Sequence, residues 1–269
     1  MIKNLFRQLT NSFLKIEKRF RFVISTLLLT FLMLFSTFFF FEKAWLFIPI
    51  FIIASYLLTY FSILEGIEKI EWLMLFIMPV VFSVSFYLFY FLFPVRWLTR
   101  LPFTLIFAVS VYALFLVSNI FNVGVEKSLQ LYRAAFSVNY FYQTLIVFLI
   151  GNLLFASRLG VFLNGFITFL IAFILANQLL WSITLNLRLE KKYYLHALFI
   201  GLILMEEVVV LSFVPFQSSI LALILTASYY SLGGLTYSFL DQRLFKETVR
   251  EYLIVLGFIL IIGLLSLGW

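Results

Sequence analysis

Apolar runs of about 20 residues follow one another along almost the whole chain, and they constrain its fold more than any other feature. A run of this length is enough for an α-helix to cross the hydrocarbon core of a bilayer. With 64% hydrophobic and 12% charged residues in 269, the chain has more apolar surface than a water-soluble domain of this size can bury. Nine runs are present, at residues 22–41, 44–64, 72–93, 103–121, 134–155, 159–181, 197–216, 218–240 and 253–269.

These runs predict an all-α fold, a polytopic bundle of about nine transmembrane helices that forms a single domain over residues 22–269. The preceding segment, residues 1–21, carries six Lys or Arg residues against one acid, Glu17. Its apolar residues recur at helical spacing, which predicts a basic amphipathic helix lying on the anionic inner leaflet. The alternative is a positively charged flank that only orients the first span.

The distribution of Lys and Arg among the connections predicts the orientation of the chain. Fifteen of them fall in the N-terminal segment and the connections after even-numbered spans, and four fall in the other connections. Positive charge accumulates on the cytoplasmic side. We therefore expect the N-terminus in the cytoplasm and the C-terminus outside.

Glu206 and Glu207 stand side by side in the middle of the seventh run, roughly 15 Å from either edge at about 1.5 Å rise per residue. Acids at this depth are rare, so the pair is interpreted as a functional site, either a proton- or cation-binding site or a general acid/base. No Lys or Arg is predicted at the same depth, so we expect at least one of the two to be protonated. The alternatives are a neutral acid that only bonds two helices together, or a span starting at Val208 that leaves both acids at the surface; the charge distribution argues against the latter.

The seventh and eighth spans form a predicted hairpin that turns near Gln217, which places Glu206 opposite residue 228. Ser228, Tyr229 and Tyr230 lie there and carry hydroxyls that can donate to a carboxylate. Adjacent helical residues point about 100° apart, so the two acids are expected to face different surroundings.

A second polar cluster is predicted in the cytoplasmic half of the fifth and sixth spans. Their hairpin turns near Ser157, so Asn139 is expected opposite residue 175, close to Asn177 and Gln178, with Arg133 nearer the cytoplasm. These residues suit either a vestibule for an anionic head group or plain hydrogen bonding between helices. The single histidine, His196, is expected at the membrane interface without a catalytic role.

Motifs of the common enzyme classes are missing from the sequence. There is no cysteine, one histidine and one aspartate, and there is no phosphate-binding glycine loop, HExxH or GxSxG. The glutamate pair resembles the start of the EExxxR motif of CAAX-protease-like intramembrane enzymes, but Leu211 stands where that motif has Arg. We therefore expect no catalytic residues, no metal and no cofactor. The sequence is more typical of a membrane protein that is not an enzyme.

The stretch NVGVEKSLQLYRAAFSVNYFYQTLIVFL, residues 122–149, resembles a segment of uncharacterised multi-pass bacterial inner-membrane proteins. The resemblance implies that the protein lies in the bacterial inner membrane. It carries no information about activity.

Two functions fit these observations. The first is a small transporter-like bundle with Glu206 or Glu207 as its protonatable residue. The second is a non-enzymatic membrane subunit or scaffold that docks a partner protein. The expected partners are the lipid bilayer and a second protein or a further copy of the chain, with no nucleic acid.

Overall fold

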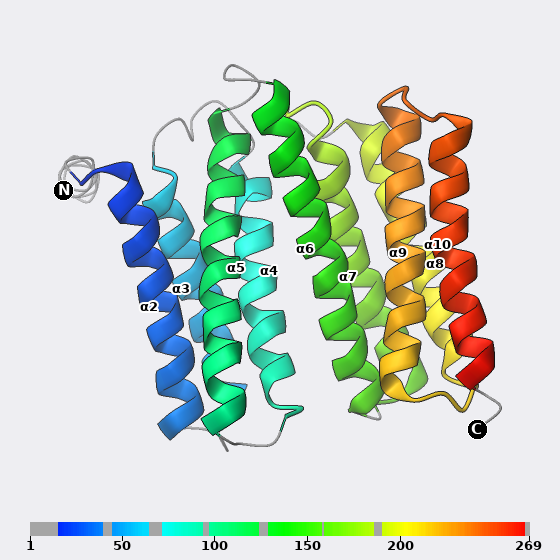
Figure 1. Ribbon diagram of the computed structural model, residues 1–269, viewed down its shortest axis with the longest axis horizontal. Coiled ribbons are helices and arrows are strands. Elements are labelled where there is room, and N and C mark those ends of the chain that lie inside the picture. The colour runs from blue at the N-terminus through cyan, green and yellow to red at the C-terminus, as the bar shows by residue number, and fades with distance from the viewer. Residues whose placement is uncertain are drawn as a thin grey trace. The chain divides into compact units, whose positions relative to one another are not determined.

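The computed structural model describes residues 16–39, 45–64, 72–93, 97–123, 129–157, 159–185 and 190–266. This part of the chain is all-helical, as predicted (Figure 1). Its helices are α2 (Lys18–Phe39), α3 (Phe47–Ser62), α4 (Trp72–Tyr90), α5 (Trp97–Val123), α6 (Leu129–Ala156), α7 (Val161–Trp181), α8 (Lys191–Leu211), α9 (Ser218–Leu240) and α10 (Lys246–Ser266).

Eight of the described helices are long and apolar enough to cross a membrane. The exception is α3, whose 16 residues extend about 24 Å at 1.5 Å rise per residue, less than the roughly 30 Å of a hydrocarbon core. The predicted span 44–64 is therefore longer than the helix that forms there. The multi-pass membrane architecture follows from the other eight.

Residues 1–15 of the predicted amphipathic helix lie outside the described residues, as do several of the connections whose charges predict the orientation. The basic residues Lys18, Arg19 and Arg21 belong to α2 itself, which begins four residues before the predicted span. Within α2, Arg21 is fully buried.

The chain divides into two compact units, Met1–Asn139 and Tyr140–Trp269, here called unit 1 and unit 2. In unit 1, α2 packs on α3 and α5, and α4 packs on α3 and α5. Aromatic rings fill its core: the Phe51 and Tyr87 rings stack with centroids 4.4 Å apart, and Phe82 lies 6.3 Å from Phe107. Such pairs stabilise a core beyond the area that they bury.

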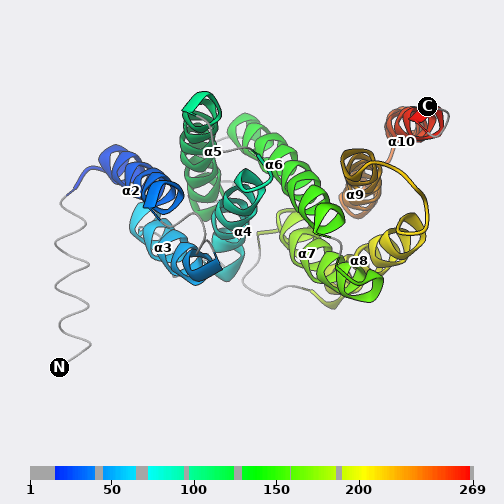
Figure 2. The same ribbon diagram turned by 90° about the horizontal axis from the view of Figure 1, so that it is seen from below.

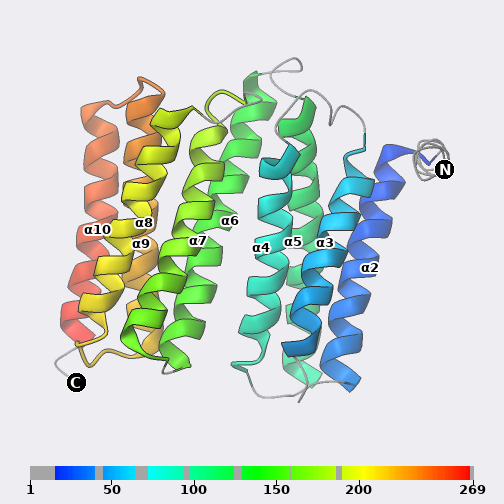
Figure 3. The same cartoon turned by 180° about the vertical axis from the view of Figure 1, so that it is seen from behind.

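Unit 2 is built around α9, which lies among α6, α8 and α10 when viewed along the helices (Figure 2). The neighbouring α7 and α8 pack closely and lie on the near side in the opposite view (Figure 3). Glycines permit this approach: a Cβ on Gly201 would lie 3.2 Å from the Phe169 carbonyl oxygen, and one on Gly151 of α6 would lie 3.2 Å from Ala222 Cβ of α9. Small residues let membrane helices pack closely in this way.

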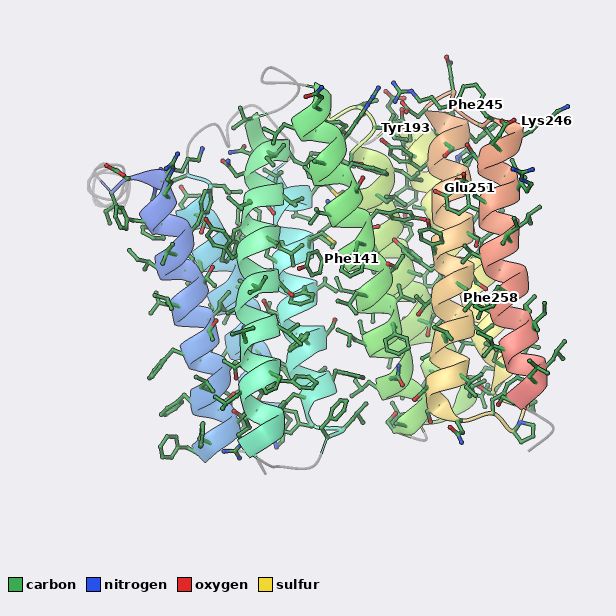
Figure 4. All side chains as sticks on the ribbon, in the orientation of Figure 1. Phe141, Tyr193, Phe245, Lys246, Glu251 and Phe258 are labelled. Atoms are coloured by element: carbon green, nitrogen blue, oxygen red, sulfur yellow. The ribbon has the colours of Figure 1, made fainter. Side chains whose placement is uncertain are left out.

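The last helix, α10, packs on α9 and leaves most of its surface uncovered. Of its residues only Gly263 is buried, and Phe258 near its middle is exposed (Figure 4). Its charged first turn, with Lys246 and Glu247, begins seven residues before the predicted span. The apolar run underestimates the length of this helix, because a charged first turn does not contribute to an apolar run.

Candidate functional site

The two glutamates diverge, and only one of them faces another helix. Glu207 is half-buried, and its Oε1 accepts a hydrogen bond of 2.6 Å from the Ser228 hydroxyl on α9. Glu206 is exposed on the outer face of α8, along which Phe199, Ile203 and Val210 are also exposed. Successive helical residues point about 100° apart, so one cannot reach α9 when the other does.

The helix that carries the acids is displaced from the predicted span. We expected residues 197–216, whereas α8 covers Lys191–Leu211, so Glu207 lies four residues before its end. Residues 212–217 connect it to α9 without helix, consistent with Pro215, which disfavours helical backbone at the residue before it. Ser228 still lies near the middle of the 23-residue α9, and the predicted turn at Gln217 is the N-cap of that helix.

The residue after Ser228, Tyr229, begins a hydrogen-bond network that joins α9 to two further helices, α6 and α7. The Tyr229 hydroxyl donates to Gln143 Oε1 of α6 at 2.8 Å. Gln143 Nε2 in turn donates to Gln178 Oε1 of α7 and, at 3.2 Å, to the carbonyl of Leu175. We call Gln143, Gln178, Glu207, Ser228 and Tyr229 the polar layer. Tyr229 and Gln143 have no exposed surface, and Gln178 is 1% exposed.

Three tyrosine rings, from α6, α9 and α10, contact one another in sequence. The Tyr140 ring of α6 stacks on Tyr230 of α9 with centroids 5.3 Å apart, and Tyr230 lies 5.1 Å from Tyr252 of α10. The Tyr140 hydroxyl donates to the carbonyl of Tyr230. Tyr252 occupies the space beside Gly234, where a Cβ would lie 2.2 Å from its ring.

Two other predicted residues, Asn177 and His196, bond to carbonyls of their own helices. Asn177 is buried, and its Nδ2 donates to the carbonyl of Phe173 in its own helix at 2.8 Å. His196 Nδ1 donates to the carbonyl of Lys192 at 2.8 Å, one turn earlier. Arg133, which is exposed, and Asn139, which is buried, belong to unit 1, so the vestibule that would join them to Asn177 and Gln178 stays a prediction.

Sequence reasoning missed Gln143, Tyr140 and Tyr252. Gln143 lies one turn after Asn139 on the same helix, so helical spacing was a signal that could have found it. Tyr252 was assigned to a connection because the predicted span began at residue 253. Gln143 Nε2 donates to the carbonyl of Leu175, the residue that was expected opposite Asn139.

Chemically, the layer offers one carboxyl group and several neutral donors and acceptors. Among the described residues no three His, Cys, Asp or Glu side chains come together in a way that could hold a metal ion. A carboxyl held by a hydroxyl can bind and release a proton, or exchange it for a small cation. No family model, curated protein or solved structure matches the chain.

Proposed function

We propose that the protein is a transporter-like membrane protein in which Glu207 is the protonatable residue. The observation that carries the proposal is the contact between Glu207 and Ser228. It places a carboxyl group next to a buried network that connects α6, α7 and α9. Intramembrane acids that face other helices and accept hydrogen bonds mark proton relays and ion pathways in membrane proteins.

In this proposal the protein lies in a bacterial inner membrane with its N-terminus in the cytoplasm and its C-terminus outside. The excess of Lys and Arg in one set of connections supports this orientation. Glu206 has a different role from Glu207, because it lies on the outer face of α8.

The two glutamates provide a matched test, since they are adjacent and chemically identical. We expect Glu207→Gln to lower proton flux into proteoliposomes at least about tenfold under an imposed potential, as loss of a relay carboxyl should. Glu206→Gln is expected to retain most of the flux. Equal loss in both variants, or none in either, contradicts the proposal.

A second candidate function, a membrane subunit that docks a partner protein, is favoured by a separate observation. The outer face of α8 presents exposed Phe199, Ile203 and Val210 around Glu206, and α10 is largely uncovered. Contiguous exposed apolar surface with an embedded polar group is typical of contact sites, although lipid covers such surface equally well. This candidate predicts that both Gln variants keep normal flux and that Glu206→Gln weakens co-purification of the partner.

A further inference from the structure

A small cavity lies inside unit 2, next to the polar layer. Its volume is about 10 Å³, near the lower limit for one water molecule. It is bounded by four helices, through Val147 of α6, Thr168 and Ala172 of α7, Leu204 of α8 and Leu225 of α9.

Three residues of the cavity wall, Val147, Leu204 and Leu225, each lie one helical turn from a member of the polar layer. Val147 follows Gln143 by four residues, and Leu225 precedes Tyr229 by four and Ser228 by three. Leu204 precedes Glu207 by three. At about 1.5 Å rise per residue these offsets amount to roughly 5–6 Å along the helices.

The one polar side chain of the cavity wall is Thr168, and its hydroxyl is unsatisfied. Thr168 is 5% exposed, and its Oγ1 has no hydrogen-bond partner in the described part of the chain. A buried hydroxyl left in this state costs about 1–3 kcal/mol, so native proteins normally satisfy it with protein or water.

A second unsatisfied atom lies one turn from Thr168 toward the start of α7. Asn164 is also 5% exposed, and its Oδ1 has no partner among the described residues, although its Nδ2 donates to the carbonyl of Leu159 at 3.4 Å. Gly160, another four residues back, is exposed, with open space where a Cβ would be. Residues four apart share one face of a helix.

We propose that water enters unit 2 at the end where α7 begins, passes along Asn164 and Thr168, and reaches the polar layer through this cavity. Each unsatisfied oxygen is a hydrogen-bond acceptor for one water molecule, and the Thr168 hydroxyl also donates. Since hydrocarbon surrounds unit 2, polar groups lining a path through the bundle are what make such a path wettable.

The inference rests on the proposed function in one respect, that this water delivers protons to Glu207. The route itself does not depend on what Glu207 does. Leu204, Leu225 and Ala172 are apolar, so the last step to the layer requires side-chain motion in the cavity wall.

The absence of cysteine from the native sequence permits a direct test. Single variants Asn164→Cys and Thr168→Cys are reconstituted in oriented proteoliposomes and exposed to silver ion, a small water-borne cation, from one side at a time. Leu170→Cys is the control, because Leu170 lies on the same helix and is 39% exposed on the outer surface. The thiol that remains is counted by maleimide after denaturation.

We expect Cys at 164 and 168 to react at least about tenfold faster than Cys at 170, and only from the side where α7 begins, because hydrocarbon excludes the ion. If Cys at 168 reacts no faster than Cys at 170, or reacts equally from both sides, the route is wrong. Because silver reactivity does not require transport, this result would leave the role of Glu207 standing.

A second pair of variants tests the Thr168 hydroxyl without a change of shape. The test is made in a Val147→Cys background, which places a thiol on the α6 wall of the cavity. There we expect Thr168→Val to slow the silver reaction about tenfold, because it removes the hydroxyl that holds water in the cavity. Thr226→Val is the matched control, since its hydroxyl donates to the carbonyl of Ala222 at 2.6 Å within α9. Equal rates in both Val variants overturn the role of Thr168. Normal silver rates combined with unchanged flux in Glu207→Gln would instead reject the proposed function and retain the route.

Discussion

Unit 1 and unit 2 satisfy their buried polar groups in different ways. In unit 1 most buried hydroxyls donate to a carbonyl of their own helix, as Ser55 does to Phe51 and Ser83 to Pro79. In unit 2 some groups do the same, as Asn177 does to Phe173, but Gln143, Gln178 and Tyr229 bond to one another between helices, and the Ser228 hydroxyl donates to the Glu207 carboxyl. A bond within one helix survives any rearrangement of its neighbours, whereas a bond between side chains of different helices requires a fixed geometry.

This difference supports placing the proposed function in unit 2. Unit 1 has contacts between helices as well, for example from the Ser62 hydroxyl to Ser25 and from Asn122 Nδ2 to the carbonyl of Ile63. The Arg100 guanidinium lies over the Phe38 ring at 4.2 Å and donates to the Tyr90 hydroxyl at 3.2 Å. These contacts fix the helices of unit 1, while unit 2 adds a half-buried carboxyl that bonds to another helix and a cavity beside the unsatisfied Thr168 hydroxyl.

The largest effect is expected where the unit 2 helices approach most closely. Gly151→Leu forces a side chain against Ala222, whose Cα would lie 3.3 Å from the new Cβ, so we expect a loss of about 1–3 kcal/mol or more of unfolding free energy. Gly257→Leu on α10 is the control, because nothing lies within 4 Å of its Cβ position. Titration with SDS in mixed micelles measures both; equal stability of the two variants would show that α6 and α9 are not in contact.

A smaller loss is expected from the centre of the polar layer. Gln143→Leu removes the hydrogen bond that the Tyr229 hydroxyl donates and one hydrogen bond of Gln178, and loss of a buried partner costs about 1–3 kcal/mol. Its unit 1 counterpart, Ser83→Ala, removes only a bond within one helix and is expected to change stability by less than about 0.5 kcal/mol. The comparison between the units fails if both substitutions cost the same.

The network also predicts coupling between its members. Tyr229→Phe combined with Gln143→Leu removes both partners of one bond, so the pair should cost less than the sum of the single changes by about 0.5 kcal/mol or more. The same unfolding measurement, made on the unmodified protein, both single variants and the double variant, completes this double-mutant cycle. Strict additivity would mean that the two side chains do not interact.

The smallest effect is expected at Ser228. Ser228→Ala removes the hydrogen bond that Ser228 donates to Glu207, and hydrogen bonds between membrane helices contribute about 0.6 kcal/mol on average. We therefore expect little loss of stability and a clear change in proton flux, since the carboxyl loses its donor. A change in stability without a change in flux would assign Ser228 a purely structural role.

The architecture was largely predictable, because hydropathy over 20 residues depends on composition and not on tertiary contacts. The pairing of Ser228 with the glutamates was predicted to within one residue, since a short turn at Gln217 fixes the register of α8 and α9. Which glutamate faces α9 was not predictable, because it depends on the rotation of α8 about its axis. The hydropathy pattern of a helix that is apolar on all sides contains no information about that rotation.

The network was harder to predict for a similar reason. Gln143 and Tyr229 are 86 residues apart in sequence, and they meet only because α6 and α9 pack together. No regular spacing along the chain signals such a pair. Thr168 looks like an ordinary polar residue in an apolar run, and its significance follows from the cavity beside it.

The most direct test of the account is the infrared carboxyl absorption of the reconstituted protein, compared between the Glu207→Gln and Glu206→Gln variants. We predict that Glu207→Gln removes a carboxylic-acid band that responds to bulk pH, and that Ser228→Ala shifts the frequency of this band because the hydrogen bond is lost. Glu206→Gln should leave the band in place. The account is contradicted if the pH-dependent band belongs to Glu206, or if Ser228→Ala leaves it unchanged.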